Sequence, residues 1–104
     1  MKFGLPDDTI NKVNAVFKKY ASIEKVIIYG SRAKGNYKNG SDIDLTFIGK
    51  ISDSEWTKIY FDLDDLLTPY TFDLSLLSKI ENPNLIAHIE RVGKVFYERD
   101  ETRG

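Results

Sequence analysis

Two short motifs in the middle of the chain contain residue types suited to phosphate chemistry. The first is Gly30-Ser31, and the second is Asp42-Ile43-Asp44, which follows after residues 32–41. Gly30 permits a close approach of the backbone to a ligand, and the Ser31 hydroxyl and the amides after it can donate hydrogen bonds to phosphate oxygens. The two aspartates supply hard oxygen ligands, which Mg²⁺ prefers. Together the motifs indicate an enzyme site for a triphosphate substrate.

The spacing of Asp42 and Asp44 would allow both carboxylates to bind the same metal ions. They begin an apolar segment, 43–48, that is typical of a strand. Residues two apart on a strand point to the same face, with Cα atoms about 6–7 Å apart. Two divalent ions about 3.5–4 Å apart can stabilise both the attacking and the leaving oxygens of an in-line phosphoryl displacement. An isolated Asp-x-Asp more often faces water near a sheet edge, so it is the upstream Gly30-Ser31 that favours a metal site here.

Asp73 is a candidate third ligand on a separate strand. Residues 70–77 alternate between apolar and polar side chains, which is the period-2 pattern of a strand, and Asp73 falls on the polar face. If this strand lies beside 43–48, the three carboxylates meet. Without a cation they would repel one another. We therefore expect Asp42, Asp44 and Asp73 to be catalytic and to bind metal.

Four other polar or aromatic positions have weaker claims to the site. Arg32 is a candidate phosphate contact together with Gly30 and Ser31, whereas Lys34 is more simply explained as a solvated residue. His88 is the single histidine and falls in a predicted helix, where we expect a structural role. Tyr37 and Tyr70 could stack on a base, but packing at the rim is the simpler interpretation.

Other nucleotide-binding motifs fit less well. Gly30 and Gly35 have the outer spacing of a P-loop, but Asn36-Tyr37 stands where Lys-Ser/Thr is required, and the chain has no Gly-x-Gly-x-x-Gly. A nucleotide-sugar glycosyltransferase also uses Asp-x-Asp to hold a metal. Such domains are usually much longer and would leave Gly30-Ser31 unexplained, so this alternative ranks third.

The order of predicted helices and strands indicates an α/β (α+β) fold that positions these residues. It has a mixed four-stranded sheet packed with about three main helices. Residues 1–104 are expected to form a single domain, with 99–104 as a frayed tail. The predicted order is a helix over 7–20, a strand over 25–29, a brief helix after Ser31, a strand over 43–48, a helix over 52–67, a strand over 70–77, a helix over 82–92 and a strand over 94–98.

Composition narrows the class of protein. The chain has no cysteine, which excludes thiol catalysis, disulfides and zinc-thiolate sites. A net charge of −1 provides no basic field, so a nucleic-acid partner is not favoured. No apolar run approaches the roughly 18 residues of a membrane span, and the start lacks a signal-peptide pattern. We therefore expect a cytoplasmic protein.

Gly30-Ser31, the ten-residue gap, Asp42-Ile43-Asp44 and a later strand aspartate resemble the DNA polymerase β-type nucleotidyltransferase superfamily. The small size and the residues of the two motifs resemble those of its minimal nucleotidyltransferases, the MNT or MntA-like proteins. The resemblance implies transfer of a nucleoside monophosphate, AMP from ATP in the expected case, to an acceptor hydroxyl with release of pyrophosphate. It implies that Asp42 and Asp44 hold two Mg²⁺ ions, with Mn²⁺ as an alternative. Asp73 would hold the catalytic ion and orient or deprotonate the acceptor, while Gly30 and Ser31 bind the phosphates.

The resemblance also implies a partner. Minimal members are commonly encoded beside a HEPN-domain protein and act as its antitoxin, in characterised cases by adenylylating a tyrosine of that toxin. We expect the same function here, with a HEPN-domain protein encoded nearby. The alternative is a binding module that neutralises the partner by occlusion, without catalysis. The sequence leaves open whether the working assembly is a homo-oligomer or a complex with the partner.

Overall fold

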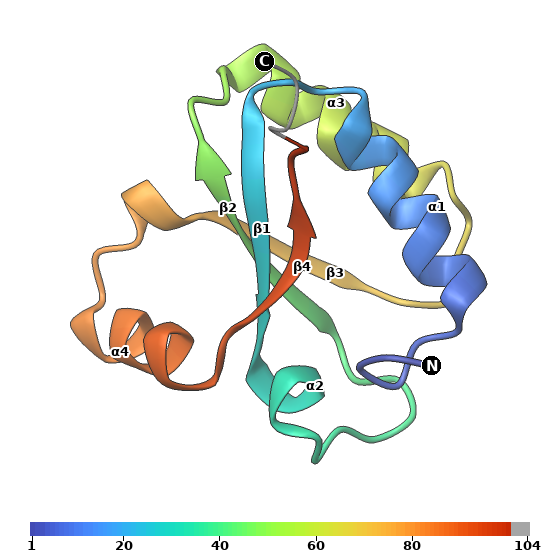
Figure 1. The fold of residues 1–104 in the computed structure, drawn as a ribbon, viewed down its shortest axis with the longest axis vertical. Coiled ribbons are helices and arrows are strands. Elements are labelled where there is room, and N and C mark those ends of the chain that lie inside the picture. The colour runs from blue at the N-terminus through green and yellow to red at the C-terminus, as the bar shows by residue number, and fades with distance from the viewer. Residues whose placement is uncertain (101–104) are drawn as a thin grey trace.

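The computed structural model describes residues 1–100 as four α-helices around one four-stranded sheet (Figure 1). A short 3₁₀ turn, Leu77–Lys79, follows the third strand. This arrangement confirms the predicted fold class. In chain order the main elements are α1 (Asp7–Lys18), β1 (Ile23–Tyr29), α2 (Gly30–Lys34), β2 (Ile43–Gly49), α3 (Asp53–Asp64), β3 (Phe72–Leu76), α4 (Pro83–Val92) and β4 (Lys94–Glu98).

The strands lie in the order β3-β2-β1-β4. β1 pairs with β2 and with β4 in antiparallel fashion, whereas β2 and β3 are parallel. Parallel neighbours need a crossover connection, and α3 supplies it. The sheet is therefore mixed, and β3 is one of its two edges.

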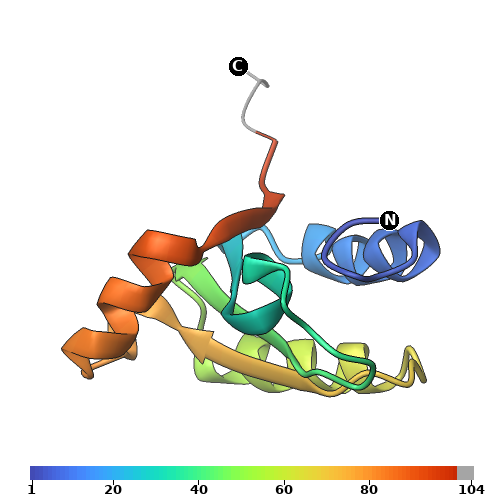
Figure 2. The same cartoon turned by 90° about the horizontal axis from the view of Figure 1, so that it is seen from below.

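The core lies between the sheet and the helices α1 and α3. Inward side chains of the strands meet apolar stripes of these two helices, and α4 lies on the opposite side of the sheet (Figure 2). Phe17 of α1 packs edge-on against Phe47 of β2, which in turn contacts Trp56 of α3. The fully buried large side chains are Leu5, Val13, Phe17, Ile23, Val26, Ile28, Ile43, Leu45, Phe47 and Ile59.

Helix α3 begins where the sequence predicts and ends earlier. Ser52 caps it, because its Oγ accepts a hydrogen bond from the Glu55 N–H at 3.2 Å. The helix stops at Asp64 instead of 67, and Leu67 adopts a left-handed φ of 55°. The residues before Pro69 therefore form a turn that leads the chain back to β3.

The C-terminal strand agrees with its predicted bounds, and hydrogen bonds continue for one residue beyond it, into the segment predicted as a tail. The Arg99 N–H donates to the Glu24 carbonyl at 2.9 Å, and its guanidinium donates to the Ala21 carbonyl. The rest of the predicted tail after Asp100 lies outside the described residues. Within residues 1–100, no helix has the length and apolar character needed to cross a lipid bilayer.

Candidate active site

The register of β2 against β3 brings predicted site residues together. Asp44 and Asp73 are direct partners in the parallel pair, so their side chains leave the same face of adjacent strands about 4.8 Å apart. Asp42 lies just before the first residue of β2 and is exposed. The three acids therefore occupy one end of β2 and its neighbour.

Asp44 has the most perturbed environment of the three acids. Its pKa is raised from 3.8 to about 6, first by partial burial and then by the charges of Asp73 and Asp42. The Arg32 guanidinium opposes this rise without cancelling it. The charges of Asp73 and Asp42 are thus close enough to disfavour the ionised form of Asp44.

Gly30 lies against the same carboxylate. It follows Tyr29, the cross-strand partner of Asp44, and has a φ of +74°. A Cβ at this position would overlap Oδ2 of Asp44. Both the left-handed backbone and the close approach therefore require glycine. Because α2 has only five residues, hydrogen-bond donors such as the Ser31 hydroxyl would contribute more to phosphate binding than a helix dipole.

The donor set suits a hard divalent cation, although the acids are not gathered around a common point. Within residues 1–100, no three His, Cys, Asp or Glu side chains form a ready-made metal cage. Asp42 and Asp73 are exposed, so they can turn away from the repulsion that raises the pKa of Asp44. Carboxylate oxygens are ligands for Mg²⁺ or Mn²⁺, and a cation would relieve that repulsion. The carboxylates present therefore suit a divalent cation.

Arg32 is buried and bound to backbone carbonyls, which favours a structural role over the predicted one in phosphate binding. It is 3% exposed, and its guanidinium donates to the carbonyls of Phe3 and Ser41 at 2.9–3.1 Å. The rings of Tyr37 and Tyr70 lie 5.4 and 5.2 Å from its Cζ. Arg32 thus joins the N-terminal loop to the loop before β2, and the two tyrosines have the packing role that the sequence favours.

We expect Arg32→Lys to affect folding more than nucleotide binding. Lysine keeps the charge but loses the forked hydrogen bonds and the stacking, which should cost about 1.5–3 kcal/mol of stability. Thermal unfolding should show the loss, while the KM for ATP should stay within about threefold of wild type. Lys34→Met, an exposed change on the same helix, is the control. Unchanged stability with a KM raised about tenfold would restore the phosphate-binding role.

Tyr29 is a site residue that the sequence analysis missed. It is 7% exposed and lies opposite Asp44, with its ring edge-on to His88 at a centroid distance of 6.2 Å. Burial raises the pKa of the Tyr29 phenol, and the charges of Asp73 and Asp44 add to the rise. The hairpin register could have located Tyr29, because cross-strand partners share a face. His88 is half-buried and packs as a structural residue.

A comparison with protein families matches the model described as "Polymerase beta, Nucleotidyltransferase" over residues 11–102. This range contains both motifs and Asp73. The chain belongs to that family. The sequence-based prediction of a nucleotidyltransferase is therefore confirmed.

Curated proteins and solved structures provide relatives of this nucleotidyltransferase. "Putative protein adenylyltransferase MJ0604" of Methanocaldococcus jannaschii is 45% identical over 40 residues, which span 38% of this chain and 40% of that protein. A chain of a toxin–antitoxin with AMP-PNP matches with a TM-score of 0.66 at 18% identity, covering 93% of this chain and 77% of that one.

Two further complexes have the same fold. A chain of the MntA–HepT toxin–antitoxin matches with a TM-score of 0.63 at 15% identity, over 90% of this chain and 74% of that one. A second match is a chain of the Shewanella oneidensis complex of a tri-AMPylated HEPN toxin with MNT antitoxin. Its TM-score is 0.61 at 16% identity, and the match covers 88% of this chain and 71% of that one. At these identities the likeness shows the fold alone.

Proposed function

We propose that this nucleotidyltransferase moves AMP from ATP to a protein hydroxyl with the help of divalent cations. The observation that carries the proposal is the placement of Asp44 between Asp73 and the Gly30 turn. A phosphate cradle and two carboxylates from different strands meet there, which is the arrangement that in-line phosphoryl transfer needs.

Each residue has a distinct task in the proposed reaction. The Ser31 hydroxyl and the amides of the Gly30 turn bind and orient the triphosphate. Asp42, Asp44 and Asp73 would hold the cations, which neutralise charge on the phosphates. Asp73 is exposed and can also accept the proton of the incoming hydroxyl. The acceptor oxygen bonds to the α-phosphorus, the bond to the β-phosphate oxygen breaks, and pyrophosphate leaves.

We further propose that the acceptor is a tyrosine of a HEPN-domain toxin and that the protein acts as its antitoxin. The support is the shared fold with antitoxins of such pairs, one of which is bound to a tri-AMPylated HEPN toxin. The matched segment of the M. jannaschii protein supports adenylyl transfer. The raised pKa of Asp44, to about 6, is consistent with a site that binds cations.

The test is a transfer assay with ATP labelled in the α-phosphate, Mg²⁺ and the HEPN protein encoded beside this chain. We expect label on a partner tyrosine and a loss of at least about hundredfold for Asp42→Asn. Asp53→Asn changes an exposed acid on α3 and should retain activity. A partner that is inhibited without label, by Asp42→Asn as well as by wild type, would contradict the proposal and support occlusion.

A further inference from the structure

The outer edge of β3 has no strand beside it in the described part of the chain. Ile43 of β2 donates its N–H to the Thr71 carbonyl at 2.8 Å, which sets the phase of the parallel pair. Alternate residues of β3 therefore direct their backbone groups away from β2, and these are Phe72, Leu74 and Leu76. On this side Tyr60 Oη donates a long hydrogen bond, 3.4 Å, to the Leu74 carbonyl. The edge is open to pairing.

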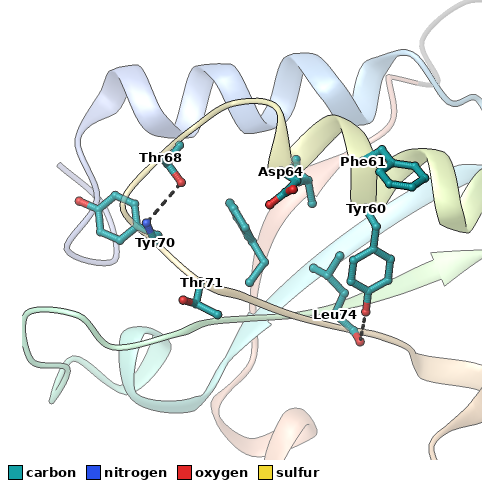
Figure 3. A pocket seen from close by; sticks show the side chains of 9 residues that line it. Tyr60, Phe61, Asp64, Thr68, Tyr70, Thr71 and Leu74 are labelled. Carbon is teal, nitrogen blue, oxygen red and sulfur yellow. Dashed lines mark hydrogen bonds between the residues drawn. The ribbon is translucent and has the colours of Figure 1, made fainter.

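A groove of about 360 Å³ lies between β3 and α3, and Thr68, Tyr70 and Thr71 of the loop before β3 also line it (Figure 3). Phe72 and Leu74 of β3 line one side, and Tyr60, Phe61 and Leu63 of α3 line the other. Two of these aromatic side chains are unusually open, with Tyr60 43% and Phe61 65% exposed. The groove thus combines free backbone groups with apolar side chains, as sites that bind an extended peptide do.

The charge of the groove selects the kind of peptide. Asp64 lines it, and no basic residue does. Within residues 1–100, neither Asp64 nor its neighbour Asp65 forms a salt bridge. A single unpaired acid, Asp64, beside apolar side chains complements a segment with both basic and apolar side chains.

We propose that this groove binds an extended, basic and apolar segment of the acceptor protein, which pairs with β3 as an added strand. The inference rests on the proposed function. It deepens that function because β3 also carries Asp73, so a segment on its outer edge runs about 4.8 Å from the strand of the third acid. A hydroxyl just beyond the docked segment is then delivered to the phosphate site.

Two comparisons within the molecule favour this occupant. A second copy bound symmetrically would use the same surface on both sides and bring the unpaired acids of the two copies together. The other sheet edge, β4, is guarded by Lys94 and Glu98, both exposed, which discourages strand pairing. On β3 the exposed charge is Asp73, which lies on the same face as Asp44, whereas Phe72 and Leu74 on the groove side carry no charge.

The test uses a fluorescent peptide of alternating lysine and valine with one terminal tyrosine, and its counterpart with glutamate for lysine. Without nucleotide, we expect fluorescence anisotropy to show binding of the lysine peptide, about tenfold tighter than the glutamate peptide. Phe61→Ser and Asp64→Lys should each weaken it about fivefold to tenfold. Val95→Ser on the β4 edge and Asp53→Lys at the start of α3 are the matched controls, since both residues are exposed.

Label transfer from ATP to the peptide tyrosine separates this inference from the proposed function. One outcome supports both the groove and the proposed function. In it the peptide is labelled, and the KM for the peptide rises in Phe61→Ser and Asp64→Lys but not in the controls. Groove-dependent binding without transfer supports the groove and contradicts the proposed acceptor chemistry. Transfer with the same KM in the two groove variants as in wild type would overturn the groove proposal. Absence of peptide binding would overturn it too, as would a dimer that Phe61→Ser dissociates.

Discussion

Asp44→Asn is expected to lose at least about a thousandfold in transfer activity and yet to unfold at a higher temperature than wild type at pH 8 in EDTA. Asp44 is half-buried between two other carboxylates, and its pKa is raised to about 6. Asparagine keeps the shape but removes the charge that burial and repulsion oppose. Activity and stability should therefore change in opposite directions at this residue.

The pH dependence follows from the direction of the pKa shift. Between about pH 4 and 6 the folded state retains a proton on Asp44 that the unfolded state has lost, so stability falls as pH rises through this window. Thermal unfolding from pH 4 to 8 should show a smaller fall for Asp44→Asn. Added Mg²⁺ should stabilise wild type more than the variant. A variant less stable than wild type at pH 8 in EDTA would contradict this account.

Gly30→Ala should lower activity about a hundredfold and destabilise the protein more than a left-handed alanine alone would. The φ of +74° costs about 1–2 kcal/mol for a residue with a Cβ. The added Cβ also overlaps Oδ2 of Asp44, so either the turn or the carboxylate must move. Both movements separate the phosphate cradle from the acid. Thermal unfolding and transfer kinetics measure the two effects.

Gly35→Ala is the matched control for this prediction. Gly35 has a φ of +90° at the end of the same helix, but a Cβ there has no heavy atom within 4 Å. It should therefore show the backbone cost alone, with activity near wild type. Equal losses in the two alanine variants would show that contact between Gly30 and Asp44 has no consequence. In a double-mutant cycle, Asp44→Ala should recover part of the stability lost in Gly30→Ala.

Local patterns were sufficient to predict the main elements and the place of Asp73. The alternation over 70–77 assigned Asp73 to the polar face, and β3 pairs so that this residue lies beside Asp44. The strand period and the need for a crossover explain this success, because both act over short stretches of chain. The end of α3 was harder to predict, since Leu66 and Leu67 continue the helical pattern beyond Asp64.

Contacts between distant segments could not be predicted in the same way. The burial of Arg32 depends on carbonyls of Phe3 and Ser41 and on two tyrosine rings, and the sequence indicates none of these partners. Charged residues after a turn are usually exposed, so residue type gave no sign that Arg32 would be buried. The groove beside β3 likewise depends on how α3 lies along a strand edge, which no motif records.

The parallel pairing of β2 and β3 also bears on the order of assembly. Gly30, Ser31, Asp42 and Asp44 all belong to the β1–β2 hairpin segment, whereas positions paired across β2 and β3 are 29 residues apart in the chain, as Thr46 and Ser75 show. Closing that longer loop has the larger entropic cost and is the slower event. A newly made chain is therefore expected to place Gly30, Asp42 and Asp44 together before Asp73 joins them. The complete candidate site then depends on the second pairing of β2, not on the hairpin alone.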